Sequence, residues 1–157
     1  MITFRRIAVL LCLSVAVLAL SEPGPQAGVS ANDAPDLHLT LTGFRNNKGV
    51  ALVSLFRSKK GFPSRYRYAA RTAIAPITHR TVSLVLTNVV PGVCAVAVCH
   101  DENNNGDMDT NWLGIPREGY GTSNNPAQER RPPDFKDARF TVADQNLDLA
   151  ITIRYWK

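Results

Sequence analysis

Hydrophobic and polar positions alternate along most of the chain. Leu37, Leu39 and Leu41 alternate with polar residues, which is the pattern of a half-buried β-strand. The predicted strand 72–78 contains Pro76, which favours a position at the edge of a sheet. The almost continuous apolar run 93–100 favours a central strand. The other expected strands cover residues 50–56, 81–86, 138–142 and 147–155.

Turn signals separate these segments. Residues 45–49 and 90–92 carry the Asn, Gly and Pro residues that tight turns need. The unpatterned stretch 58–71 predicts a loop with a short helical turn near Tyr68, and we expect no helix longer than two turns. About seven short strands predict an all-β fold, namely an antiparallel β-sandwich of immunoglobulin-like or transthyretin-like type. A small barrel is the alternative.

The start of the chain has the pattern of a secretory signal peptide. Arg5 and Arg6 precede the uncharged apolar run 7–20, which is short for a bilayer core of about 30 Å. We therefore expect residues 1–31 to be a signal peptide with a short linker and residues 32–157 to form a single domain. The protein is then exported to the periplasm or the extracellular space, with no membrane span after cleavage.

Two cysteines remain in the expected domain. Cys94 and Cys99 are five residues apart in one predicted strand, so their side chains point to opposite faces. Their separation of roughly 16 Å exceeds the Cα distance of about 7 Å that a disulfide allows. We expect both to be small buried residues that are not bonded to each other.

Charge is distributed unevenly along the chain. The 157 residues contain 18 Lys and Arg against 13 Asp and Glu. The densest basic group is Arg57, Lys59, Lys60, Arg65, Arg67 and Arg71. This segment is either a solvated basic loop or a surface that binds a polyanion such as nucleic acid or an anionic glycan, or an anionic membrane. We expect no nucleic-acid partner, because no nucleic-acid-binding motif is present and the chain is predicted to be exported.

A polar segment after the 93–100 strand carries the candidate metal site. Its side-chain oxygens alternate around a tight turn at Gly106, as in the first half of a calcium loop, and Trp112 stands where an EF-hand has its bidentate glutamate. Ca²⁺ suits such a flexible oxygen cage better than Mg²⁺. The proposed ligands are Asp101, Asn103, Asn105, Asp107 through its carbonyl, Asp109 and Glu118. Asx residues also form metal-free turns by bonding their own backbone, so both interpretations stay open.

Residues of this segment and its flanks form one longer pattern: Pro91-Gly92, His100 to Gly106, Asp109, Gly114 to Pro116, Glu118 to Gly121, Ser123 to Asn125, and Pro133 with Phe135. This pattern resembles the bacterial exported family called domain of unknown function 2141. The resemblance covers residues 36–156, and it implies a small exported β-sandwich without an activity to carry over. Cys94 departs from the family pattern, which often has an aromatic residue there.

The sequence favours a binding or accessory module over an enzyme. It contains neither Gly-x-Ser-x-Gly nor His-Glu-x-x-His. The alternative is a small hydrolase in which His100 acts as a base beside the acidic cluster. A zinc site would need His38, His79 and His100 to converge from different segments. His100, Trp112 and Tyr120 are the candidate surface for a glycan or peptide ligand.

Overall fold

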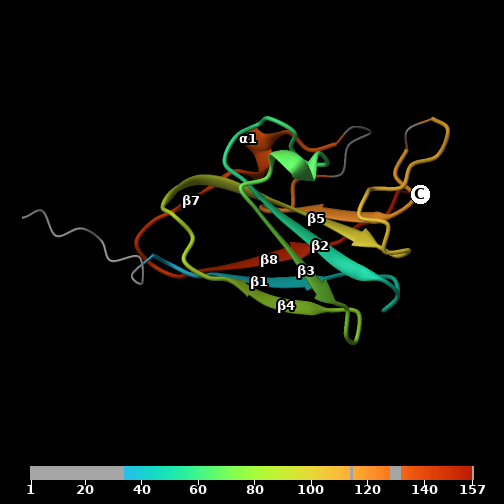
Figure 1. Ribbon diagram of the computed structural model, residues 1–157, viewed down its shortest axis with the longest axis horizontal. Coiled ribbons are helices and arrows are strands. Elements are labelled where there is room, and N and C mark those ends of the chain that lie inside the picture. Colours follow the sequence, from blue (N-terminus) through green and yellow to red (C-terminus); the bar gives the residue numbers. More distant parts are fainter. Residues whose placement is uncertain (1–33, 114, 128–131, 157) are drawn as a thin grey trace, which may run out of the picture.

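The computed structural model describes residues 34–113, 115–127 and 132–156. This part of the chain forms two β-sheets that pack face to face, with very little helix (Figure 1). The predicted signal peptide at residues 1–31 lies outside the described residues. Within the described ranges, no helix is long and apolar enough to cross a membrane.

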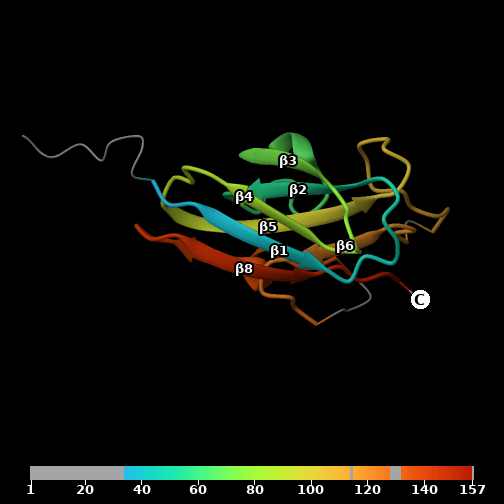
Figure 2. The same cartoon turned by 90° about the horizontal axis from the view of Figure 1, so that it is seen from below.

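The smaller sheet has three strands in the order β4-β1-β8. These are β1 (Leu37–Thr42), β4 (Val82–Leu86) and β8 (Leu147–Thr152). Figure 2 shows β1 between its two neighbours. The β1–β4 pair is antiparallel, but β1 and β8 run parallel, with Leu37 opposite Leu147. The predicted β-sandwich is confirmed, but the antiparallel pairing expected for it does not extend to β1 and β8. The chain reaches β8 through the other sheet, and this connection is long enough for parallel pairing.

The larger sheet has the order β3-β2-β5-β6, and β7 also pairs with β5. Its strands are β2 (Val50–Phe56), β3 (Arg71–Pro76), β5 (Gly92–Asp101), β6 (Gly119–Thr122) and β7 (Phe140–Val142). The edge position of the Pro76 strand and the central position of the 93–100 segment are confirmed. Strand β6 lies inside the stretch 101–135, for which only a loop was expected; two of its four residues are glycine, so it carries little side-chain pattern.

The hydrophobic core fills the space between the sheets. Leu37, Leu39 and Leu41 of β1 are buried there against Val53 of β2 and Val96 of β5. The alternation in β1 buries every second residue, as the sequence predicts. The all-β sandwich follows from this shared apolar interior.

The larger sheet is covered on its outer face as well, which is the face turned away from the smaller sheet. From Cys94 onward, every residue of β5 is buried. Two covering segments contain η1 (Tyr66–Tyr68) and α1 (Phe135–Ala138). Phe62 connects the two covering segments to the sheet, because its ring packs edge-to-face on Phe56 of β2 and on Phe135 of α1. A second buried layer therefore lies outside the sandwich core.

The two cysteines lie on opposite faces of β5. Cys94 belongs to the core cluster, whereas Cys99 contacts Met108 and Glu118 on the outer side. Both are buried and free. The prediction that they do not bond to each other is confirmed, and its geometric reason holds.

One isolated bridge joins the two sheets beyond the end of β8. The N–H of Tyr120 donates to the Arg154 carbonyl at 2.9 Å, and the N–H of Arg154 donates back at 2.8 Å. This bridge ties the chain's C-terminal segment to β6. Consecutive residues then lie on either side of β6: Tyr155 contacts His100 inside, and Trp156 stacks on Tyr120 outside.

Candidate binding site

A cavity of about 350 Å³ lies on the outer face of the larger sheet. Ala97 of β5 and Thr122 of β6, which are register partners, form part of its floor. Segments that are far apart in sequence form the walls. The wall residues are Pro63, Ser64 and Tyr66 after β2, Asp107, Met108, Thr110 and Pro116 after β5, and Tyr120, Pro132 and Trp156. The volume is within the range of small-molecule sites.

Aromatic and hydroxyl groups set the chemistry of this cavity. The rings of Tyr120 and Trp156 stack with centroids 6.4 Å apart. Thr122 is only 3% exposed, and its Oγ1 has no hydrogen-bond partner among the described residues. The indole Nε1 of Trp156 is likewise buried and unpaired there. Such groups are costly when unsatisfied, so this wall can accept a ligand that supplies partners.

Tyr66, which lines the cavity, and the neighbouring Cys99 form a neutral pair. Burial raises the pKa of the Cys99 thiol to about 12. Burial also raises the pKa of Tyr66, whose hydroxyl bonds this thiol, above its ordinary value of 10.0. Both groups therefore stay protonated at physiological pH, and Cys99 is not an activated nucleophile.

The predicted calcium loop is ordered by its own hydrogen bonds. The Asp101 carboxylate is buried and accepts the N–H of Asn105 at 3.1 Å and of Gly106 at 2.8 Å. Glu118 closes the loop from the other side. Its carboxylate accepts the N–H of Glu102 at 2.9 Å and of Asp109 at 3.0 Å. Both carboxylates thus stabilise the loop by accepting hydrogen bonds from its backbone N–H groups.

The amide side chains of the loop point to Asp109. Asn103 Nδ2 donates to one carboxylate oxygen at 2.8 Å, and Asn105 Nδ2 donates to the other at 3.0 Å. In this arrangement the amide nitrogens, not the amide oxygens, face Asp109. Among the described residues, no group of three or more His, Cys, Asp or Glu side chains is arranged as a metal site. Hydrogen bonds therefore gather Asp101, Asn103, Asn105, Asp109 and Glu118 around one turn, but the acidic side chains among them do not form such a group.

Asp107 lies apart from that group. Its N–H donates to Asn105 Oδ1 at 2.9 Å, which keeps its backbone in the turn. Its side chain lines the cavity and also a second hollow beside Arg65 and Arg67. The carboxylate of Asp107 is thus directed to the outer-face loops.

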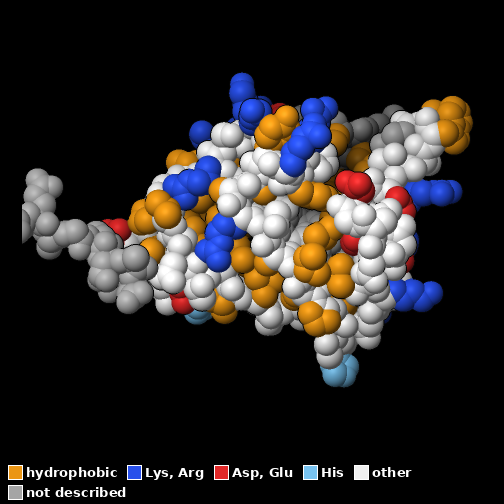
Figure 3. All heavy atoms as spheres, in the orientation of Figure 1, with side chains coloured by type: hydrophobic (Ala, Val, Ile, Leu, Met, Phe, Trp, Pro, Cys, Tyr) orange, Lys and Arg blue, Asp and Glu red, His pale blue; other side chains and the backbone are white. Residues whose placement is uncertain are grey.

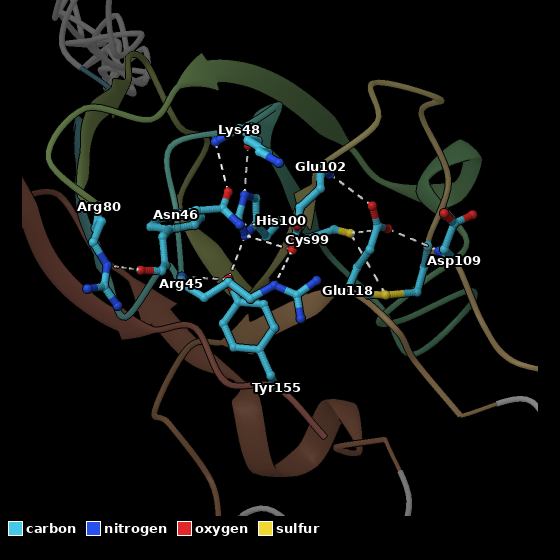
Figure 4. Close-up of polar contacts among 12 residues, drawn as sticks. Arg45, Asn46, Lys48, Arg80, Cys99, His100, Glu102, Asp109, Glu118 and Tyr155 are labelled. Atoms are coloured by element: carbon cyan, nitrogen blue, oxygen red, sulfur yellow. Dashed lines mark hydrogen bonds and ion pairs between the residues drawn. The ribbon is translucent and has the colours of Figure 1, made fainter. Parts of the chain in front are cut away.

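His100 is fully buried on the inner side of β5, with both ring nitrogens engaged. Its Nε2 lies 2.8 Å from the Lys48 carbonyl, and its Nδ1 lies 2.5 Å from Tyr155 Oη (Figure 4). Tyr155 Oη also accepts the Arg45 N–H at 3.0 Å. The carbonyl can only accept, so Nε2 carries a proton, and the phenol can donate to Nδ1. His100 therefore holds three segments together.

The candidate ligand surface of His100, Trp112 and Tyr120 is not assembled. His100 is buried in the interior, Tyr120 lines the cavity, and Trp112 is 90% exposed at the end of a projecting loop. Residues 99 and 100 face opposite sides of β5, which separates His100 from the outer-face cavity. The residues Tyr66, Thr122 and Trp156 were missed, since they are isolated in sequence and meet only through the fold.

The Ser123-Asn124-Asn125 motif, which follows β6, has a structural role. Ser123 Oγ accepts the Val96 N–H at 3.0 Å and lies 2.5 Å from the Ala138 carbonyl. Asn124 Nδ2 donates to the Asp137 and Arg139 carbonyls. Asn125 bonds β8 in the same way, through the Ala150 carbonyl and the Thr152 N–H. These three side chains fasten β5, α1 and β8 to one another. 

A comparison with protein families agrees with the family resemblance that the sequence motifs indicate. One family model matches residues 39–150, and its description is "Uncharacterized protein conserved in bacteria (DUF2141)". No curated protein and no solved structure gives a significant match. The match spans most of the chain and includes the loop, the cavity floor and the Ser123 motif. The chain therefore belongs to the DUF2141 family.

Proposed function

We propose that the protein is an exported, non-catalytic binding module whose ligand occupies the outer-face cavity. The main support for this proposal is the buried Thr122 hydroxyl in the cavity floor. This hydroxyl has no hydrogen-bond partner among the described residues. Leaving such a group unsatisfied costs about 1–3 kcal/mol. A ligand that bonds Thr122 or the nearby Trp156 indole recovers part of this cost. The neighbouring aromatic stack supplies apolar contact area.

The lining favours a mostly apolar ligand group with one or two polar atoms. Tyr66, Tyr120 and Trp156 provide rings, and Met108 provides an adaptable apolar wall. A peptide with an aromatic or aliphatic side chain fits this chemistry better than a glycan, whose many hydroxyls need more partners than the cavity offers.

The geometry of His100 favours binding over hydrolysis. A general base needs a free nitrogen within reach of a substrate. His100 is fully buried and uses both nitrogens, on Tyr155 and on the Lys48 carbonyl. The hydrolase alternative would require this network to open before catalysis.

Fluorescence of Trp156 tests the proposal directly. The chain has two tryptophans, so Trp112→Phe leaves Trp156 as the single reporter. Short peptides with one aromatic or aliphatic residue, and disaccharides as the second class, are titrated into this variant. Saturable changes with the peptides are expected. Ala97→Leu, which fills the floor, should abolish them, and Ala143→Leu at an exposed site should not.

Two outcomes would contradict the proposal. If no probe changes Trp156 emission, the cavity is not a site for these ligands. If Ala97→Leu binds as well as the control variant, the ligand lies elsewhere. Export is tested separately, by fractionating bacterial cells that express the full chain; retention of the uncleaved chain in the cytoplasm would contradict it.

A second proposal concerns Ca²⁺ at the Asx loop. Asp101, Asp109 and Glu118 bring three carboxylates to one turn, and no ion pair joins them to a Lys or Arg of the described ranges. Two of these carboxylates, Asp101 and Glu118, are buried, and backbone N–H groups are their hydrogen-bond donors in place of a counter-ion. Burying a charge without a counter-ion is costly. A hard divalent cation would offset that charge. The Asn103 and Asn105 amides would then have to turn, so that their oxygens replace their nitrogens.

A further inference from the structure

An apolar tip projects from the loop after β5. The tip consists of Trp112, Leu113 and Ile115, which are 90%, 60% and 39% exposed. Figure 3 shows hydrophobic side chains at the end of this projecting loop. Large apolar side chains at such exposure are unfavourable in water and mark interaction surfaces when they cluster.

Hydrogen bonds hold the apolar tip in its extended form. Asn111 Oδ1 accepts the N–H groups of Leu113 and Ile115, both at 2.9 Å. The Asn111 N–H donates to the Ile115 carbonyl at 2.8 Å, and Thr110 pairs with Pro116 below. These backbone donors are satisfied within the hairpin. The tip can therefore enter an apolar medium without leaving these groups unpaired.

A basic loop lies on the same side of the molecule. Residues 57–71 contain six Lys and Arg and no Asp or Glu. Arg57 and Arg71 bond the carbonyls of residues 87, 90 and 91. The remaining four are exposed: Lys59, Lys60, Arg65 and Arg67. Asp107 lies beside Arg65 and Arg67 and offsets only part of this charge.

The apolar tip and the basic loop project to the same side of the sandwich (Figure 1). In the view of Figure 1, the segment with η1 and the hairpin after β5 both extend beyond the sandwich on the same side. In Figure 3, Lys and Arg side chains lie along that side, and the hydrophobic tip projects at one end of it. A flat surface could touch both at once. A narrow groove of a protein partner would take the tip but leave the basic loop unused.

We infer that this side of the protein docks on a membrane with anionic phospholipids, which is a role beyond the proposed ligand binding. Trp112 would sit at the headgroup level, where tryptophan is favoured, with Leu113 and Ile115 beside it. Lys59, Lys60, Arg65 and Arg67 would lie against lipid phosphates. Each basic residue near an anionic surface contributes about 1 kcal/mol, roughly fivefold in partitioning.

Trp112 is also the probe that tests this inference. Trp156→Phe leaves Trp112 as the single tryptophan of the full chain. The variant is mixed with vesicles of phosphatidylglycerol and phosphatidylcholine, and with vesicles of phosphatidylcholine alone. Brominated acyl chains report depth locally, so tethering by residues 1–31 does not itself quench Trp112. We expect a blue shift and quenching with the anionic vesicles and little change with the neutral ones.

Two variants in the single-tryptophan background separate the contributions. Replacing Lys59, Lys60, Arg65 and Arg67 together by Gln should weaken partitioning by more than roughly tenfold. Leu113→Ser with Ile115→Ser should remove the quenching while the basic loop stays intact. Lys48→Gln, an exposed change elsewhere, is the matched control and should have little effect.

Unchanged Trp112 emission with anionic vesicles would overturn the inference and leave the tip as a contact for a protein partner. Equal quenching by anionic and neutral vesicles would overturn it too, as would full quenching after the four Gln substitutions. Circular dichroism of each variant checks that the fold is retained. This test reads only the emission of Trp112 and adds no cavity ligand, so its failure leaves the proposed ligand binding untouched.

Discussion

The hydroxyl of Tyr155 lies 2.5 Å from Nδ1 of His100, a residue 55 positions earlier in the chain. This contact joins the C-terminal segment to the C-terminal end of β5 inside the protein. It also fixes the direction of a hydrogen-bond relay, in which the Arg45 N–H donates to the Tyr155 oxygen and His100 donates to Lys48. Every ring nitrogen of His100 is thereby satisfied without an ion or a substrate.

Removing the Tyr155 hydroxyl should destabilise the fold. Tyr155→Phe keeps the ring but leaves His100 Nδ1 buried without its donor, which costs about 1–3 kcal/mol of unfolding free energy. Urea unfolding followed by circular dichroism measures the difference. Tyr68→Phe is the matched control, because that side chain is exposed. Equal midpoints for both variants would show that the relay contributes no stability.

The ion pair of Arg45 with Glu102 makes stability depend on pH. Burial raises the pKa of Glu102, but the hydrogen bonds from Arg45 and Asn46 and the attraction of Arg45 outweigh it, so the net pKa falls below its ordinary value of 4.5. A lowered pKa means that the stabilisation is complete above pH 4.5 and is lost as the pH falls through the folded-state pKa.

Glu102→Gln tests this dependence. At pH 7 the variant should be less stable by about 0.5–1 kcal/mol, since the pair is partly exposed. The difference from the native protein should shrink when unfolding is measured at progressively lower pH below 4.5. A difference that stays constant over that range would show that the charge of Glu102 does not matter.

Gly119 makes room for the Tyr155 ring. A Cβ at this position would lie 2.5 Å from ring atoms of Tyr155 and 2.7 Å from Cγ2 of Ile153. Gly119→Ala should therefore cost about 1–3 kcal/mol. In a double-mutant cycle with Tyr155→Leu, the two costs should add to more than the cost of the double variant. Strict additivity would place the effect of the alanine elsewhere.

Calcium should raise the melting temperature if it offsets the carboxylates of Asp101, Asp109 and Glu118. A concentration of 100 times Kd stabilises by about 2.7 kcal/mol, which corresponds to several degrees. Melting is compared in EDTA, in millimolar Ca²⁺ and in Mg²⁺, with Asp109→Asn as the variant that should lose the response. Identical curves in EDTA and Ca²⁺ would leave the loop as a metal-free turn.

Sequence patterns predict the strands well where one face is buried. The alternation in 37–42 follows directly from the period of two in a β-strand, and the apolar run 93–100 indicates burial on both faces. Strand β6 carries no such signal, because Gly119 and Gly121 occupy its inner positions. The parallel pairing of β1 with β8 depends on long-range topology and not on local pattern.

The two candidate sites also differ in how far the sequence predicts them. The Asx loop is visible in sequence because its residues are adjacent, and the structure does bring Asp101, Asp109 and Glu118 together. The cavity is not visible, because Tyr66 and Trp156 are 90 positions apart and meet only when both cover β5 and β6. Local spacing cannot encode such a meeting.

Native Cys94 and Cys99 should resist thiol reagents. Burial raises the pKa of Cys99 to about 12 and also raises the pKa of Cys94, so the reactive thiolate of both residues is disfavoured. The Cys12→Ser chain isolates these two thiols. Ellman's reagent should label neither in the native protein and both in denaturant, because unfolding exposes them and restores an ordinary pKa. Rapid labelling of one thiol under native conditions would show that the face of β5 carrying it opens, and single Ser variants would identify which face.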